Sequence, residues 1–159
     1  MKLLVINPNT TDAITEILYQ RAVDVADPRT EIIAKTAPFG VDYIKTPEDG
    51  AVSIDAIRQL IQEHHNTVDA AVICSSSDSG LQEMRGEFDI PITAMTESSL
   101  RMGSMLGKSG CLLVYLDFGI KDMTLRAEKY GMSWFLKSVR IPIKFDGGIP
   151  PDPSAFKQA

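Results

Sequence analysis

Short apolar runs, most of them followed by polar loops, alternate with stretches of helical periodicity along most of this chain. The apolar runs, which we predict to be strands, cover residues 3–6, 30–35, 70–74, 90–94, 111–116 and 139–143. The stretches with helical spacing, which we predict to be helices, cover residues 13–25, 47–65, 80–87, 96–106 and 121–130. Strand–helix units of this length predict an α/β fold, in which a parallel sheet carries helices on both faces.

The alternation weakens toward the end of the chain. We expect a first α/β lobe over residues 1–100 and the beginning of a second, incomplete lobe over residues 101–143. Residues 144–159 contain Gly147-Gly148, Pro150-Pro151 and Pro153. Such a sequence opposes both a long helix and a central strand, so we expect an extended or disordered tail.

Composition excludes several classes of partner. The net charge of -5 is unfavourable for binding nucleic acid. No apolar run is long enough to span a bilayer, and Asn7-Pro8-Asn9 interrupts the first apolar run too early for a signal peptide, so we expect a cytoplasmic protein. We expect Cys74 and Cys111 to be free thiols, and no residues have metal-ligand spacing.

Polar loops follow the predicted strands where each strand ends. In a parallel sheet these ends meet at one edge, and ligands bind there. Amides, hydroxyls and free N–H groups at such an edge can hold a small anion or imide. The candidate binding residues are Asn7, Pro8, Asn9, Thr10, Thr11, Pro38, Ser76, Ser77 and Thr96.

Each loop also has a purely structural interpretation. Residues 7–11 can form a turn with a helix cap, residues 75–77 can form a serine-rich turn, and residues 78–80 can cap the helix that follows them. No Gly-x-Ser-x-Gly elbow surrounds the serines, which leaves a hydrolase triad unsupported. No Gly-x-Gly-x-x-Gly or Walker-type loop is present either, which argues against nucleotide cofactors.

In combination, four segments resemble the aspartate/glutamate racemase superfamily, and within it the hydantoin and allantoin racemase branch. They are residues 6–11, 36–44, 69–81 and 90–99, and the similarity continues to Gly131. The resemblance implies a flavodoxin-like lobe and a small-molecule substrate such as a hydantoin, an amino acid or a small carboxylate. It also implies chemistry without a cofactor.

The family's chemistry, as the resemblance implies it, uses two cysteines on opposite sides of the substrate's α-carbon. One thiolate removes the α-proton, and the other thiol returns a proton from the opposite face. Hydrogen-bond donors must stabilise the enolate-like charge, and helix N-termini and polar groups must lower the pKa of the thiol.

This chain departs from that pattern at the catalytic positions. When the motif is aligned on Asp78 and Gly80, the first catalytic cysteine falls on Ser75, and Cys74 lies one residue early. On a strand, a shift of one residue turns a side chain to the other face. Tyr115 stands where the family usually has a threonine, and the resemblance makes it a further candidate substrate-binding residue. We expect the chain to end before the segment that carries the second cysteine. Cys111 lies inside a predicted strand and does not match that motif.

Three hypotheses follow. The first is a racemase-like enzyme that acts through Cys74 or Ser75 and is impaired, or that performs one-base chemistry such as decarboxylation or isomerisation. The second is a non-catalytic, racemase-like protein that binds a small carboxylate or imide. The third is a shortened fold that self-associates, so that a homo-oligomer is expected.

Overall fold

The computed structural model describes residues 1–114 and 117–141. The chain divides into two compact units, Met1–Ser99 and Leu100–Ala159. Each unit is described by itself below. Tyr115 and the tail expected over residues 144–159 lie outside the described residues.

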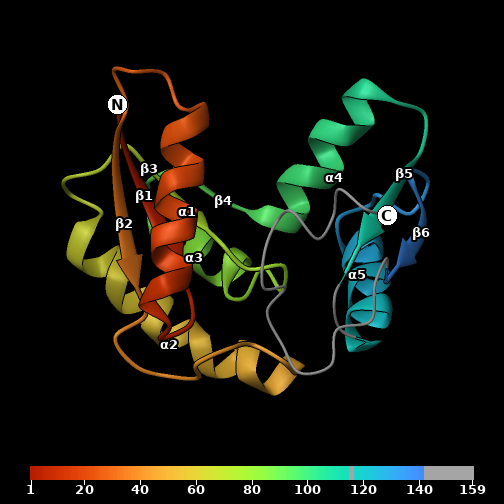
Figure 1. Ribbon diagram of the computed structural model, residues 1–159, viewed down its shortest axis with the longest axis horizontal. Coiled ribbons are helices and arrows are strands. Elements are labelled where there is room, and N and C mark those ends of the chain that lie inside the picture. The colour runs from red at the N-terminus through yellow and green to blue at the C-terminus, as the bar shows by residue number, and fades with distance from the viewer. Residues whose placement is uncertain (115–116, 142–159) are drawn as a thin grey trace. The chain divides into compact units, whose positions relative to one another are not determined.

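The first unit contains a four-stranded sheet. Its strands are β1 (Lys2–Asn7), β2 (Glu31–Thr36), β3 (Ala70–Ile73) and β4 (Ile92–Ala94). They lie in the order β2-β1-β3-β4, and every neighbouring pair is parallel (Figure 1). The prediction of a parallel α/β sheet is therefore confirmed.

Helices cover both faces of this sheet. They are α1 (Asp12–Val25), α2 (Pro47–His64) and α3 (Leu81–Glu87), while α4 (Met95–Leu106) begins directly after β4. Alternation along the strands directs Leu4, Ile6 and Ile73 to the face that carries α2 and α3. These side chains are fully buried against Ile57 and Leu81, so the main core lies on this side.

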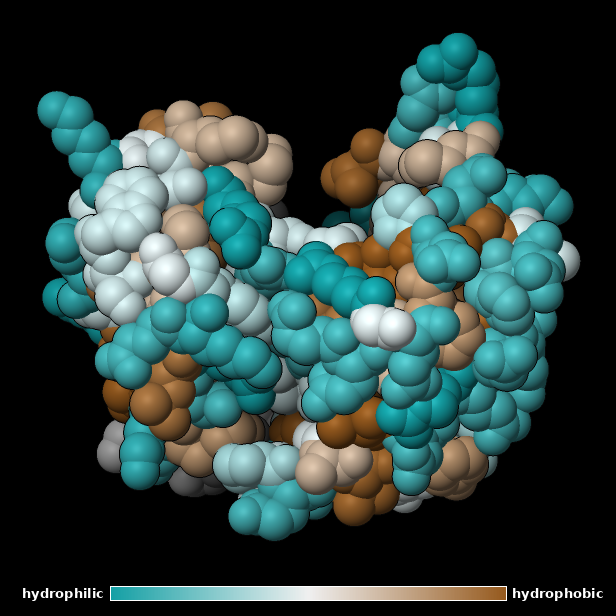
Figure 2. All heavy atoms as spheres, turned by 180° about the vertical axis from the view of Figure 1, so that it is seen from behind, coloured by the Kyte–Doolittle hydropathy of each residue, from teal (hydrophilic) through white to brown (hydrophobic). Residues whose placement is uncertain are grey.

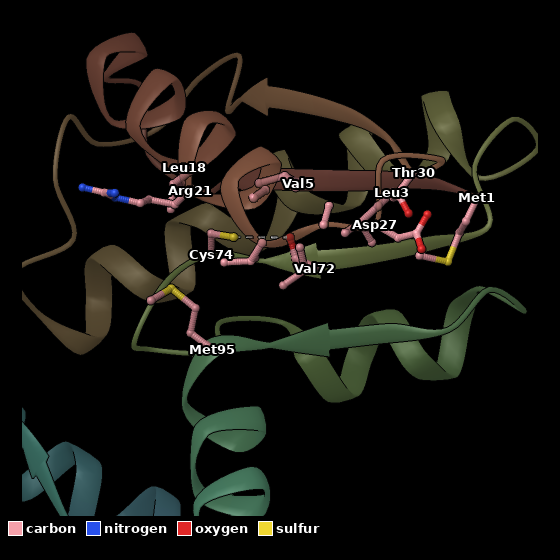
Figure 3. A pocket seen from close by; sticks show the side chains of 13 residues that line it. Met1, Leu3, Val5, Leu18, Arg21, Asp27, Thr30, Val72, Cys74 and Met95 are labelled. Atoms are coloured by element: carbon pink, nitrogen blue, oxygen red, sulfur yellow. Dashed lines mark hydrogen bonds between the residues drawn. The ribbon is translucent and has the colours of Figure 1, made fainter.

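The opposite face of the sheet is covered less completely. Helix α1 packs on β1 and β2, yet none of its residues is fully buried (Figure 1). A mainly apolar hollow of about 480 Å³ remains between α1 and the sheet. Leu3, Val5 and Val72 of the strands and Leu18 of α1 line it (Figure 3).

The helix termini follow local signals in the sequence. Thr46 and Asp49 form a reciprocal capping box at the start of α2, with Pro47 in the first turn. Gly131 follows α5 (Asp117–Lys129) with φ +68°, which favours glycine. For α1 the sequence predicts a cap from the loop over residues 7–11. Thr11 is the N-cap residue, but its side chain makes no cap hydrogen bond.

The second unit has its own small core. Strands β5 (Gly110–Leu113) and β6 (Leu136–Arg140) pair in parallel, and α5 (Asp117–Lys129) connects them. Phe135 is buried with Leu100, Ala127 and Met132. A side chain at Gly110 would place its Cβ only 2.5 Å from the Phe135 ring, so glycine permits this approach.

Two boundaries in this unit differ from the sequence predictions. Helix α5 begins at Asp117 rather than near residue 121, and β6 begins at Leu136 rather than near residue 139. The apolar run over residues 139–143 marked only the end of β6. The strand starts earlier because Leu136 pairs with Gly110, a contact distant in sequence that a local pattern does not reveal.

The surface seen from behind is mostly hydrophilic, with separate apolar patches (Figure 2). This is the pattern expected of helices that bury one face and expose the other. Within residues 1–114 and 117–141, no helix combines the length and apolarity needed to cross a membrane.

Candidate ligand site at the strand ends

The loops that follow β1, β2 and β3 leave the sheet at the same edge. The backbone N–H of Ala37 donates to Asn7 O at 2.9 Å, and that of Cys74 donates to Ile6 O at 2.8 Å. These bonds extend the strand pairing into the loops on both sides of β1. The polar residues of the three loops therefore begin next to one another, at the carboxyl edge where parallel sheets bind ligands.

Asn7 organises the loop after β1. Its side chain is fully buried, and its amide nitrogen lies 3.0–3.1 Å from Asn9 Oδ1, Thr11 O and Thr15 Oγ1. Its side-chain oxygen accepts from the N–H of Asn9. Because these contacts use both ends of the amide, Asn7 holds the loop in place. Pro8 is buried beside it.

Asn9 differs from Asn7 in one respect. Its side-chain oxygen accepts from the N–H of Thr11 at 3.1 Å and from Asn7. Among the residues that the structure describes, none accepts a hydrogen bond from Asn9 Nδ2, although the residue is only 7% exposed. The amide nitrogen is thus a fixed and available donor.

The hydroxyls of Thr10 and Thr11 serve the neighbouring loop. Thr10 Oγ1 donates to Val41 O at 3.3 Å, and Thr11 Oγ1 donates to Asp42 O at 2.7 Å. These bonds tie the loop after β2 to the loop after β1. Pro38 lies in the same loop and is exposed.

The serine-rich loop contains a chain of hydroxyls. Ser75 Oγ lies 2.6 Å from Ser77 Oγ, which lies 2.7 Å from Ser79 Oγ. Ser75 is half-buried, Ser76 is exposed, and the other two are buried. The start of α2 packs against this chain so closely that a Cβ at Gly50 would lie 2.8 Å from Ser79 Oγ.

Asp78 joins the serine-rich loop to α4. It has φ 45°, and its carboxylate oxygens accept from the N–H groups of Thr96 and Glu97 at 2.9 and 2.8 Å. Thr96 Oγ1 donates to Ser76 O at 2.8 Å. The expectation that residues 78–80 cap the following helix is confirmed at Gly80, which is the N-cap of α3, whereas the side chain of Asp78 caps α4. The backbone N–H and the hydroxyl of Thr96 therefore both form hydrogen bonds to the serine-rich loop.

Cys74 faces away from the serine hydroxyls. Its thiol lines the hollow beneath α1, on the same side of the strand as Val72, and Sγ lies 3.9 Å from Val72 O (Figure 3). Burial in these apolar surroundings raises the pKa of the Cys74 thiol to about 12. At neutral pH the thiol is protonated, which makes it a poor base.

Sequence reasoning missed two features of this site. It did not identify Asp78 as the link to α4, and it did not identify Gly50 as the point where α2 approaches the serines. For Asp78 the sequence contains a partial signal of an unusual backbone, because Asp tolerates a positive φ better than most residues and Asp78 has φ 45°. Within the described part of the chain, no group of three His, Cys, Asp or Glu side chains is arranged to hold a metal ion.

The fold and the strand-end loops together define an α/β protein of racemase type, and comparisons with known proteins agree. The family model described as Asp/Glu/hydantoin racemase matches residues 3–141. The chain belongs to this family and resembles its hydantoin and allantoin racemase branch.

Three relatives illustrate the similarity. A hydantoin racemase of Pseudomonas sp. (strain NS671) is 33% identical over 142 residues, which are 88% of this chain and 57% of that protein. The crystal structure of allantoin racemase from Pseudomonas fluorescens has a TM-score of 0.86 at 25% identity, and allantoin racemase from Klebsiella pneumoniae has 0.84 at 27% identity. These matches cover 91% and 89% of this chain and 62% and 58% of those chains. The chain thus spans about three-fifths of the length of these relatives.

Proposed function

We propose that this chain binds a small carbonyl-bearing molecule, such as a hydantoin, an amino acid or a small carboxylate, at the loops after β1 and β3. We further propose that α-proton transfer at this site is impaired. The family membership and the relatives with hydantoin and allantoin specificity support the ligand class.

The observation that carries the binding proposal is the side chain of Asn9. Asn9 is 7% exposed, and no side-chain N or O atom of the described residues is both buried and without a partner, so its Nδ2 reaches the surface, where it can donate to a ligand. The carbonyl oxygen of an imide ring or an oxygen of a carboxylate has the required chemistry. Asn7 supports this role by holding Asn9 Oδ1 in place.

The observation that carries the impairment is the arrangement of Cys74 and Ser75. The serine hydroxyl at the first cysteine position is a much weaker base than a thiolate. The neighbouring thiol of Cys74 lines a different hollow and has a raised pKa. Neither group supplies a thiolate to the loops at neutral pH.

The test is deuterium exchange at C5 of 5-methylhydantoin in heavy water, followed by proton NMR against a blank without protein. We expect exchange close to the blank for the natural chain. Ser75→Cys should accelerate it by about 100-fold, the lower range for a positioned proton-transfer group. Adding Asn9→Ala should remove most of that gain.

The opposite result would be rapid exchange by the natural chain that Cys74→Ala abolishes. That outcome would show that Cys74 reaches the substrate and that the chain is a competent enzyme. The proposed impairment and the assignment of Ser75 to the cysteine position would then both be wrong.

A non-catalytic binding function is the second candidate, and the raised pKa of the Cys74 thiol together with the serine at position 75 favours it. Such a protein should gain thermal stability as hydantoin or a small dicarboxylate is added, with the dependence on concentration that mass action requires. A melting temperature that does not change with either ligand would exclude this candidate.

A further inference from the structure

The serine hydroxyls after β3 form a chain whose direction can be worked out from its buried end. Ser79 is 9% exposed, and Ser77 Oγ is the only hydrogen-bond partner of its hydroxyl among the described residues. A buried hydroxyl whose proton is not used loses a hydrogen bond at full desolvation cost. Ser79 therefore donates its proton to Ser77.

The next step follows from the capacity of a hydroxyl group, which has one proton and two lone pairs. Ser77 accepts from Ser79 and keeps its own proton for Ser75 Oγ, 2.6 Å away. The backbone N–H of Ser77 also donates to Ser75 Oγ, at 3.2 Å. Ser75 Oγ thus receives two hydrogen bonds from the same residue.

We propose that Ser75 is a hydrogen-bond donor to an acceptor oxygen of the ligand, and that Ser77 and Ser79 are positioning residues that direct its proton outward. Both lone pairs of Ser75 are occupied, so only its proton remains for a ligand. Ser75 is half-buried, so part of the residue remains accessible to a ligand. This inference rests on the proposed function and specifies it further.

The consequence is a choice of ligand chemistry. A carboxylate or a ring carbonyl accepts the Ser75 proton, whereas an ammonium group or an N–H at the same place finds no lone pair. Each hydroxyl that donates along the chain also polarises the next one, which strengthens the final donor. In this protein, Ser75 takes the position of the proton-removing cysteine that the resemblance implies, and it donates a hydrogen bond instead.

The first experiment tests the direction of the hydrogen bonds along the serine hydroxyls, and it needs no ligand. Ser75→Cys is made in a Cys74→Ala, Cys111→Ser background, and the pKa of the single thiol is measured from the pH dependence of its alkylation. Two donors stabilise the thiolate, so its pKa should lie below the ordinary value of about 8.5. Adding Ser77→Ala should raise it, and Ser77→Thr should restore the low value.

The second experiment measures hydantoin affinity by calorimetry. Ser75→Ala and Ser77→Ala should each weaken binding by about three- to tenfold, the effect of one hydrogen bond. Ser79→Ala should weaken it less, and Ser77→Thr should bind like the natural chain. Ser104→Ala is the matched control, because among the described residues the hydroxyl of half-buried Ser104 bonds only Arg101 O of its own helix.

The outcomes separate the two proposals. If the pKa of the thiol at position 75 does not respond to Ser77→Ala, the hydroxyl order is wrong, whatever the ligand does. If hydantoin binds and folded Ser75→Ala binds it equally well, Ser75 does not donate to it. If neither hydantoin nor a carboxylate binds the natural chain, the proposed function is wrong, while the thiol measurement still decides the hydroxyl order.

Discussion

Cys74 and Ser75 are neighbours in the sequence but have different surroundings. The side chain of Cys74 lies in the apolar hollow beneath α1, and that of Ser75 lies in the hydroxyl chain. Cys74 continues the alternation of β3 just beyond Ile73 and lies on the side of Val72, whereas Ser75 lies in the bend that follows. The ability of each side chain to act on a ligand at the loops therefore depends on these surroundings.

The raised pKa of Cys74 predicts its reactivity with iodoacetamide. Below about pH 12 the folded protein keeps this thiol protonated, so alkylation should be slow at pH 8 and should rise as the pH approaches 12. The exposed Cys111 is the internal comparison and should react first. Mass spectrometry of the digested protein measures both sites, and equal labelling at pH 8 would contradict the burial of Cys74.

At the scale of elements, Asp78 stabilises α4 from a different loop. Asp78→Ala should lower the free energy of unfolding by about 2–4 kcal/mol, since it removes a buried charged acceptor from two backbone N–H groups. Asp78→Asn keeps one acceptor oxygen and should cost less. Urea denaturation measures both, and a loss below about 0.5 kcal/mol for Asp78→Ala would place it among ordinary surface substitutions.

The contact between α2 and the serine-rich loop gives a second prediction at this scale. Gly50→Ala should destabilise the protein, because its Cβ would lie 2.8 Å from Ser79 Oγ. Gly86→Ala is the matched control, since a Cβ there meets nothing within 4 Å, and it should stabilise α3 by up to about 1 kcal/mol. Thermal unfolding compares them, and a Gly50→Ala protein as stable as Gly86→Ala would refute the close approach.

These elements also show how far the sequence determines the fold. The strand ends at Asn7 and Ile73 follow from local patterns to within one residue, and so does the capping box at Thr46, so the sheet edge and its loops could be predicted. The roles of Asp78 and Leu136 could not, because each depends on a residue distant in sequence. The direction of Cys74 followed from alternation, whereas the free donor of Asn9 required the coordinates.

At the scale of the whole molecule, the two units have separate cores. Phe135→Ala should destabilise the second unit by about 3–5 kcal/mol, the usual cost of removing a buried aromatic ring. Hydrogen exchange should accelerate in β5 and β6, while the amides of β1 and β3 keep their protection. Equal loss of protection in both units would show that they unfold as one.

The central claim is that the loops after β1 and β3 form one site for a small carbonyl-bearing ligand. The most direct measurement is titration of the ¹⁵N-labelled chain with hydantoin, followed by the chemical shifts of its amides. The account predicts that the Asn9 side-chain amide and the backbone amides of residues 75–77 shift together along one binding curve. Shifts confined to Leu3, Val5 and Val72 beneath α1, or no shifts at all, would contradict it.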